Sequence, residues 1–242
     1  MLRKIFAVLL MLAWGSALTY AQGTEAKEAD TKKVKGGGGG GFMVGVSQFD
    51  LNTLNDKLKA KGFEDLGDNQ IFFGGGGYGI INGKILLGGE GGGFSKDVAS
   101  STQKASLSGG YGFFDIGYVI FSKSGFNLFP LLGIGGGGFS LRIVERAPSP
   151  TFDEILDDPK REANISTGSF LFNFALGLDY LLALGEDKEG RGGLLLGIRA
   201  GYIFDPTKAD WKMTDQDVLK GPDIRFTGPY VHLVLGGMGA SK

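Results

Sequence analysis

The chain has 242 residues, of which 45 are glycine, one is histidine and none is cysteine. The lack of cysteine excludes disulfides, thiolate catalysis and zinc–thiolate sites. The formal net charge of −1 lacks the basic excess that nucleic-acid binding requires, so we expect no nucleic-acid partner.

Residues 1–21 have the pattern of a secretory signal peptide. Two basic residues precede the apolar run Ile5–Trp14, and Ala21 closes the cleavage site. A bilayer-spanning helix needs about 20 apolar residues, so this run favours a cleaved signal over a membrane anchor. We therefore expect export, with the polar residues 22–35 as a flexible leader before the domain of residues 36–242.

The first candidate strand follows a run of six glycines that would by itself be typical of a linker. Because Phe42, Val44 and Val46 come next on alternate positions, the run is interpreted as the start of a strand. The same alternation recurs along the chain, because side chains of a strand point to opposite faces in turn. It predicts eight strands, near residues 38–47, 69–81, 84–95, 104–121, 126–144, 165–182, 192–204 and 223–238.

The connections between these strands alternate in length. Asn82-Gly83 predicts a tight hairpin, because a type I′ turn needs two positive φ angles. "SKSG" and "ALGEDKEGR" form the other short joints, whereas longer loops are expected at 48–68, 96–103, 145–164 and 205–222. In the first of these, Leu51, Leu54 and Leu58 share one helical face and Gly62 stops the helix.

An even number of strands with short turns on one side and long loops on the other is typical of a transmembrane barrel. On this pattern the chain resembles the small eight-stranded outer-membrane β-barrel proteins of Gram-negative bacteria. The resemblance implies an all-β, antiparallel up-and-down barrel in the cell outer membrane, with short turns in the periplasm. It also implies membrane lipids and the barrel-assembly machinery as partners. Such proteins often end on an aromatic residue, whereas this chain ends in "LGGMGASK".

The segment 72–94 contains 11 glycines, although glycine weakens a strand. An eight-stranded barrel explains them, because its interior is just wide enough for side chains and its wall is strongly bent. Gly74, Gly76 and Gly79 also match a dinucleotide fingerprint, but that motif needs a following helix. Here Asn82-Gly83 turns the chain into another strand, so no cofactor is expected.

In two long strands, one face is large and apolar while the other is mostly small or polar. The barrel interpretation turns the first face toward lipid. The residues expected there are Phe170, Phe172, Phe174, Leu176, Leu178, Leu194, Leu196 and Ile198.

Charged side chains inside apolar strands should point into the lumen, since a basic residue facing lipid would cost about 2–4 kcal/mol. We expect a structural network there, with a proton or ion path as the alternative. Its predicted members are Glu90, Asp115, Arg142, Asp179, Arg199 and His232.

Little in the sequence indicates chemistry. Some barrels of the class that the chain resembles are lipid-modifying enzymes with a histidine and a serine, but the sequence fixes no serine near His232. The acidic loop 145–164 lacks the ligand spacing and glycine turn of a calcium site. We therefore expect no catalytic residue, no metal and no enzymatic activity.

The expected function is structural, or is the binding of an unknown extracellular ligand through loops 48–68, 145–164 and 205–222. Trp211 in the last loop would be an interface anchor or a loop-packing residue. One alternative is a soluble exported barrel that binds an apolar ligand, as lipocalins do, with the apolar strand face turned inward. A lipid-modifying barrel enzyme is the other alternative.

Overall fold

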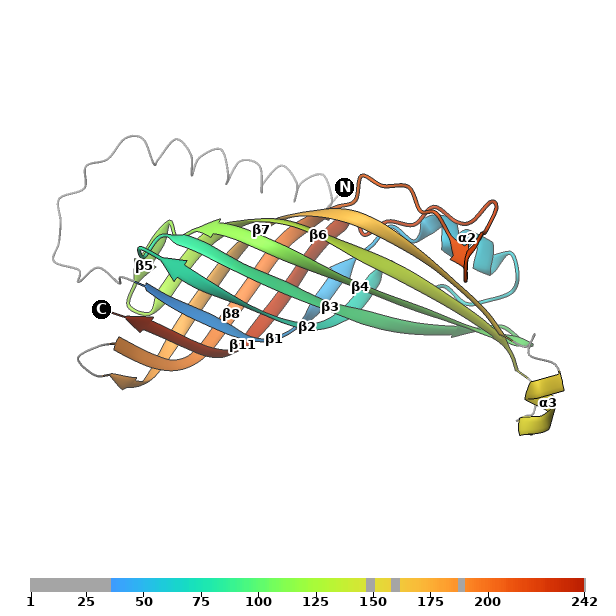
Figure 1. Cartoon of the computed structure of the whole chain (residues 1–242), viewed down its shortest axis with the longest axis horizontal. Coiled ribbons are helices and arrows are strands. Elements are labelled where there is room, and N and C mark those ends of the chain that lie inside the picture. The colour runs from blue at the N-terminus through green and yellow to red at the C-terminus, as the bar shows by residue number, and fades with distance from the viewer. Residues whose placement is uncertain (1–35, 147–150, 158–161, 187–189, 242) are drawn as a thin grey trace.

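The computed structural model describes residues 36–146, 151–157, 162–186 and 190–241. The expected signal peptide and the leader at 22–35 lie outside these residues. Eight long strands dominate the described part of the chain (Figure 1). They are β1 (Gly36–Gln48), β2 (Asn69–Ile81), β3 (Ile85–Ala99), β4 (Gln103–Tyr118), β6 (Phe126–Glu145), β7 (Glu162–Glu186), β8 (Gly190–Phe204) and β11 (Gly228–Ser241).

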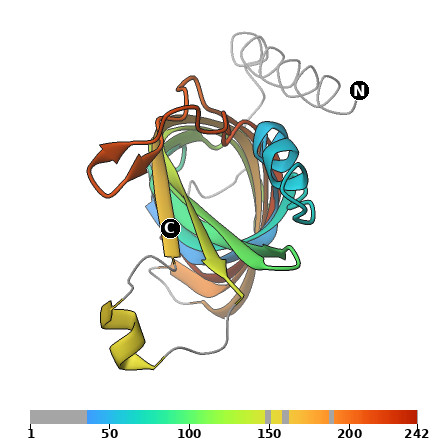
Figure 2. The same ribbon diagram turned by 90° about the vertical axis from the view of Figure 1, so that its right-hand side faces the viewer.

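These strands close into a barrel. Each pairs antiparallel with the next long strand in the chain, and β11 pairs with β1 from Gly36↔Ser241 to Ser47↔Tyr230. Viewed along its axis, the molecule is a ring with the helix α2 (Asn52–Lys59) at its rim (Figure 2). The prediction of an all-β, eight-stranded up-and-down barrel with a short helix in the first long loop is therefore confirmed.

Tight turns join the strands at the end of the barrel where β11 finishes, which we call the turn end. Asn82 and Gly83 both have positive φ, and the Lys84 amide donates to the Ile81 carbonyl at 3.1 Å. Ser124 and Gly125 repeat the two positive φ angles between the short strand β5 (Phe121–Lys123) and β6. The turn at Asn82-Gly83 follows the hairpin chemistry predicted from the sequence, and the predicted short joint at "SKSG" has the same pair of positive φ angles.

Several strand boundaries differ from those predicted near the ends of strands. The expected loop 96–103 is a tight turn, because β3 continues to Ala99 and β4 begins at Gln103. An ion pair of 2.7 Å between Asp97 and Lys104 joins these two strands near the turn, and the Lys104 hydrogen bond lowers the pKa of Asp97. The fourth strand stops at Tyr118 rather than residue 121, and the last strand begins at Gly228 rather than 223.

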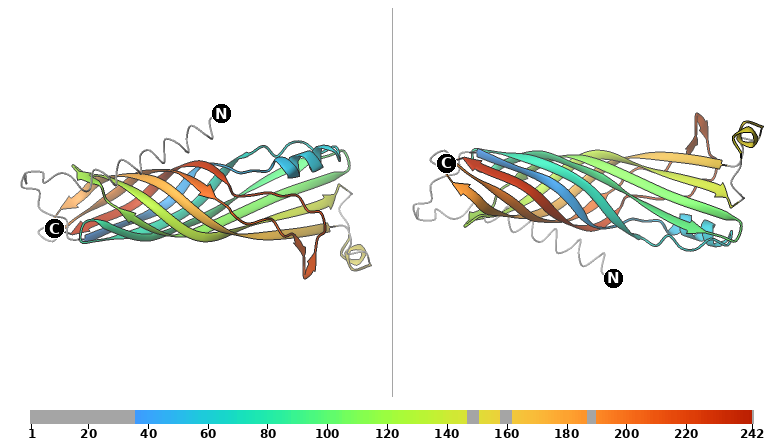
Figure 3. Two further views of the ribbon diagram at one scale, coloured as in Figure 1. Left: turned by 90° about the horizontal axis from the view of Figure 1, so that it is seen from above. Right: turned by 90° about the horizontal axis from the view of Figure 1, so that it is seen from below.

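At the opposite end, which we call the loop end, four strands run beyond the closed ring. β7 has 25 residues against 15 in its neighbour β8, and only Phe172–Glu186 of β7 pair with β8. At the loop end, β3, β4, β6 and β7 thus form a curved sheet that continues past the barrel (Figure 3). We refer to this sheet as the extension.

Loops cover the concave face of the extension. α2 buries Leu54 and Leu58, and the Glu64 amide after it donates to the Ala99 carbonyl at the tip of β3. The chain between β8 and β11 forms a small hairpin of β9 (Lys212–Met213) and β10 (Gln216–Asp217), which pairs with β7 through Ser166↔Lys212. The extension therefore has an apolar core that loop residues complete.

Gly62 ends the α2 segment as the sequence predicted. Its φ is +78°, its amide donates to the Lys59 carbonyl, and the Phe63 amide donates to the Leu58 carbonyl. These two bonds and the buried Leu58 and Phe63 side chains form a Schellman motif. A second helix, α3 (Phe152–Asp157), stands at the tip of the extension. No helix within the described residues is long and apolar enough to cross a membrane.

Candidate functional site: the barrel lumen and the loop end

The centre of the lumen contains a buried ion pair. Arg199 on β8 donates from Nη1 and Nη2 to the two carboxylate oxygens of Asp179 on β7, at 2.5 and 3.0 Å. The hydroxyl of Tyr78 on β2 also donates to Asp179, and the guanidinium lies 4.7 Å from the ring centroid of Phe129. Such bidentate geometry fixes both side chains, and removing one partner would strand a charge.

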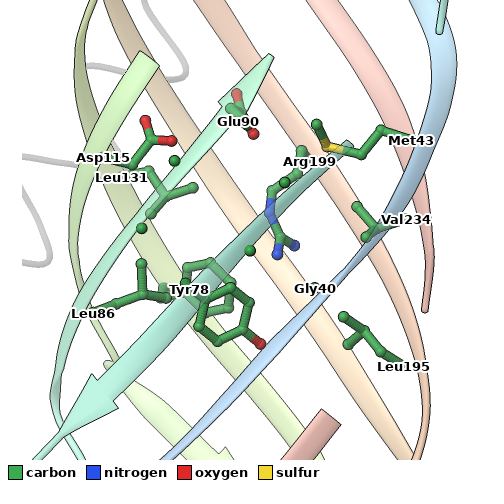
Figure 4. Close-up of a pocket in the computed structure, with 15 residues that line it drawn as sticks. Gly40, Met43, Tyr78, Leu86, Glu90, Asp115, Leu131, Leu195, Arg199 and Val234 are labelled. Atoms are coloured by element: carbon green, nitrogen blue, oxygen red, sulfur yellow. The ribbon is translucent and has the colours of Figure 1, made fainter. Parts of the chain in front are cut away.

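A second group lies beside this pair. Asn173 on β7 donates from Nδ2 to Oε1 of Glu90 on β3 at 3.2 Å and accepts the Tyr230 hydroxyl at 2.9 Å. Asp115 on β4 is only 4% exposed, and its carboxyl is hydrogen-bonded by Asn173, although its Oδ1 has no hydrogen-bond partner among the described residues. Glu90, Asp115 and Arg199 line a cavity of about 30 Å³ together with Tyr78 (Figure 4).

The third lumen group surrounds the histidine. Nε2 of His232 lies 3.0 Å from the hydroxyl of Ser47 on β1, which in turn lies 3.4 Å from the Tyr111 hydroxyl. The imidazole is fully buried and stacks on Phe72 at 4.6 Å between centroids. Its Nδ1 has no hydrogen-bond partner among the described residues. A serine and a histidine thus touch, but no third group orients the imidazole as a catalytic base requires.

An aromatic tier closes the lumen toward the loop end. Phe139 stacks on Phe226 at 3.9 Å between centroids, and Phe49 stacks on Phe94 at 5.1 Å. Two of these four rings come from strands, whereas Phe49 and Phe226 belong to the long connections. Reciprocal backbone hydrogen bonds of 3.0 and 3.1 Å between residues 50 and 225 hold those two connections together.

Five of the six predicted lumen residues lie inside the barrel: Glu90, Asp115, Asp179, Arg199 and His232. The prediction for Arg142 was wrong. Its side chain is exposed on the outside of the extension, where its guanidinium makes a 2.6 Å ion pair with Glu162 on β7. The physical reason is strand parity. The buried side chains of β6 are at odd positions such as Phe139 and Leu141, so Arg142 points outward, on the part of β6 that extends past the ring.

The eight residues expected to face lipid all lie on the outer surface. Phe170, Phe174, Leu178, Leu194, Leu196 and Ile198 are exposed, and Phe172 and Leu176 are half-buried between neighbours. Whether lipid covers them stays a prediction.

The sequence analysis missed several lumen residues: Tyr78, Tyr230, Asn173, Ser47 and Tyr111. Strand parity was available for three of them, since Asn173 lies on the small or polar face of its strand, Tyr230 shares the parity of His232, and Ser47 alternates with Val46. Parity does not give the position of a side chain along the barrel axis. That position depends on the tilt and stagger of the strands, which decide which inward residues lie next to one another.

Trp211 is a loop-packing residue. Its side chain is 2% exposed, and its Nε1 donates to the Pro222 carbonyl at 2.7 Å. In contrast, Phe152 and Leu156 of α3 are 73% and 65% exposed at the tip of the extension. No cluster of three or more His, Asp or Glu suited to a metal occurs in the part of the chain that the structure describes.

Comparisons with known proteins were made for both the sequence and the fold. No family model and no curated protein matches the sequence. Among solved structures, the outer membrane protein OprG from Pseudomonas aeruginosa is similar at a TM-score of 0.44 and 15% identity, covering 89% of this chain and 99% of that one. The outer membrane protease OmpT from Escherichia coli is similar at a TM-score of 0.34 and 9% identity, covering 91% and 100%. The barrel architecture described above rests on this chain's own strand pairing.

Proposed function

We propose that this protein is a non-enzymatic outer-membrane barrel that acts structurally or by binding through its loop end. The observation that carries the proposal is the outer surface of the ring. All eight long strands place large apolar side chains there, about 40–60% exposed, among them Phe42, Phe73, Ile85, Phe114, Ile134, Phe170, Leu196 and Leu233. A water-soluble protein rarely exposes a continuous apolar surface of this extent.

The outside of the extension has the opposite character, which supports an orientation in the membrane. Its exposed residues include Ser95, Ser108, Asn164 and Ser166, and its charges form cross-strand pairs such as Asp97–Lys104. Polar side chains of this kind suit water. We therefore infer that the apolar ring spans the bilayer and the extension projects from the cell, with the tight turns in the periplasm.

The lumen favours neither a lipocalin-like function nor transport of a large solute. Its polar groups bind one another, and the cavity of about 30 Å³ is far below the roughly 300–1,000 Å³ of a small-molecule pocket. The large apolar strand face is turned outward, whereas a lipocalin would need it inside. These features support a closed barrel that serves as a scaffold.

A binding role is assigned to the loop end because exposed apolar side chains gather there on otherwise polar segments. Besides Phe152 and Leu156 of α3, Leu219 next to the β9–β10 hairpin is 86% exposed. Surface loops on a rigid barrel are where such proteins place recognition. The ligand would be an extracellular molecule that contacts these side chains.

Single-cysteine labelling tests the membrane assignment, because the chain has no cysteine of its own. Phe174→Cys should react in lipid vesicles with a membrane-dissolved probe and resist aqueous maleimide. Ser166→Cys on the extension of the same strand should react with aqueous maleimide, and provides the matched control. Aqueous labelling of both positions, together with release of the protein by osmotic shock, would contradict the proposal.

A further inference from the structure

The helix α3 forms without packing against the rest of the protein. A capping box holds its first turn: the Thr151 amide donates to Oε2 of Glu154 at 2.7 Å, and the Glu154 amide donates to Oγ1 of Thr151 at 3.3 Å. The Ile155 amide donates to the Thr151 carbonyl at 3.2 Å. None of the residues of α3 is buried. Local hydrogen bonds therefore define the shape of this segment and leave its apolar side chains uncovered.

Three apolar side chains lie on one face of α3. Phe152, Ile155 and Leu156 follow the i, i+3, i+4 spacing that brings side chains together on a helix, and all three are exposed. Lipid around the ring cannot cover them, because α3 stands at the far tip of the polar extension (Figure 1). An exposed apolar cluster on an otherwise polar surface indicates a site of interaction with another molecule.

Carboxylates border this apolar face. Asp153 and Asp157 lie four residues apart, on the same side of the helix and next to Leu156. The helix contains no basic residue, and neither aspartate makes an ion pair with another described residue. A molecule that covers the apolar face must therefore also meet negative charge. Like-charge repulsion disfavours both a second α3 and an anionic lipid surface as that molecule.

A positively charged partner with an apolar face of its own complements both features. We propose that α3 captures cationic amphipathic peptides, which pack apolar side chains on the apolar face of α3 and place lysine or arginine beside its two aspartates. An amphipathic helix can pack on α3 in this way because it also presents apolar side chains at i, i+3 and i+4. This inference rests on the binding role proposed above and gives that role a class of ligand.

Peptide binding to the protein in nanodiscs tests the proposal. The full mature chain is inserted into phosphatidylcholine nanodiscs, and the probe is a fluorescein-labelled amphipathic helical peptide made only of leucine and lysine. Wild-type nanodiscs should raise the fluorescence anisotropy of the peptide above its value with empty nanodiscs. The rise should become smaller at high salt, because part of the attraction is electrostatic. Equal anisotropy with and without the protein would overturn the proposal.

Double variants assign the binding to α3. Phe152→Ser/Leu156→Ser should weaken peptide binding about tenfold or more, because it removes two large apolar side chains from the contact. Asp153→Asn/Asp157→Asn should weaken binding at low salt and remove most of its salt dependence. Asp97→Asn changes an exposed carboxylate of β3 that is paired with Lys104, and should bind as wild type. Unchanged binding by either double variant would refute the role of α3.

Insertion into the nanodiscs separates a failure of this inference from a failure of the proposed function. All the substituted side chains are exposed, so each variant should insert as wild type does. Protein that does not insert into lipid would contradict the membrane barrel itself, whereas inserted protein that ignores the peptide would contradict only peptide capture. Dimers of the inserted protein that Phe152→Ser/Leu156→Ser separates would assign the apolar face to a second copy of the chain, and would also overturn the proposal.

Discussion

Gly201 on β8 lies directly against the ring of Tyr230 on β11. A Cβ atom at position 201 would come within 2.7 Å of the Cε1, Cζ and Oη atoms of that tyrosine. The same relationship recurs at Gly133, where a Cβ would come 2.5 Å from Oδ1 of Asp115. Inward glycines of this barrel therefore leave the space that particular lumen side chains occupy.

Replacing Gly201 with alanine should lower the free energy of unfolding by about 1–3 kcal/mol, because the added methyl overpacks a ring that is fixed by its bond to Asn173. Gly237→Ala on β11 is the matched control, since a Cβ there meets nothing within 4 Å. Denaturant unfolding in detergent micelles measures both. Equal effects of the two substitutions would mean that glycine acts on the strands rather than on lumen space.

Arg199→Leu should destabilise the protein by about 3–5 kcal/mol, because it leaves Asp179 buried without its guanidinium. Arg142→Leu removes an arginine whose ion pair with Glu162 is exposed, and should change stability little. The double variant Arg199→Leu/Asp179→Leu should recover part of the loss, since no buried charge remains. An unchanged unfolding midpoint for Arg199→Leu would mean that water reaches this pair.

The topology of the barrel in the membrane can be read by protease accessibility. A cleavage site inserted between Asn82 and Gly83 should be protected in intact cells, because that turn is expected in the periplasm. A site inserted in α3, between Asp153 and Glu154, should be cut from outside. Immunoblotting of intact and permeabilised cells compares the two, and cleavage in the reverse pattern would invert the proposed orientation.

The contact between Ser47 and His232 invites a test for catalysis. We expect no acyl release from radiolabelled phospholipid vesicles that contain the protein, because both side chains are fully buried and Nδ1 of the histidine lacks an orienting partner. Ser47→Ala should behave as wild type in this assay. Acyl release that both Ser47→Ala and His232→Ala abolish would instead establish a lipid-modifying enzyme.

The barrel could be predicted from the sequence because the alternation of large apolar with small or polar side chains can be recognised within each strand by itself. Phe170, Phe174 and Leu178 alternate with small or polar residues over many positions, and Asn82-Gly83 fixes one hairpin by local chemistry. The ends of the strands were less predictable. Ser95 and Asp97 look like loop residues, but they continue β3 because the extension carries a water-exposed outer face.

Five ionisable residues of the lumen could be predicted from the sequence, but their pairing and their neutral partners could not. Alternation reveals which charges point inward, yet it cannot tell that Arg199 meets Asp179 while Glu90 meets Asn173, since these partners are set by the stagger of strands far apart in the chain. Arg142 has the outward parity of β6, which it shares with the exposed Leu132 and Ile134, so alternation separates it from the lumen charges.

The two phenylalanines that the long connections contribute to the aromatic tier limit how these loops can evolve. Phe49 and Phe226 fill the mouth of the barrel, and the paired backbones of residues 50 and 225 lock them in register. Replacing either connection as a whole would remove one of these rings and open the lumen at the loop end. Substitutions, insertions and grafted epitopes should be tolerated instead at α3 and at the β9–β10 hairpin, which contribute no ring to the aromatic tier.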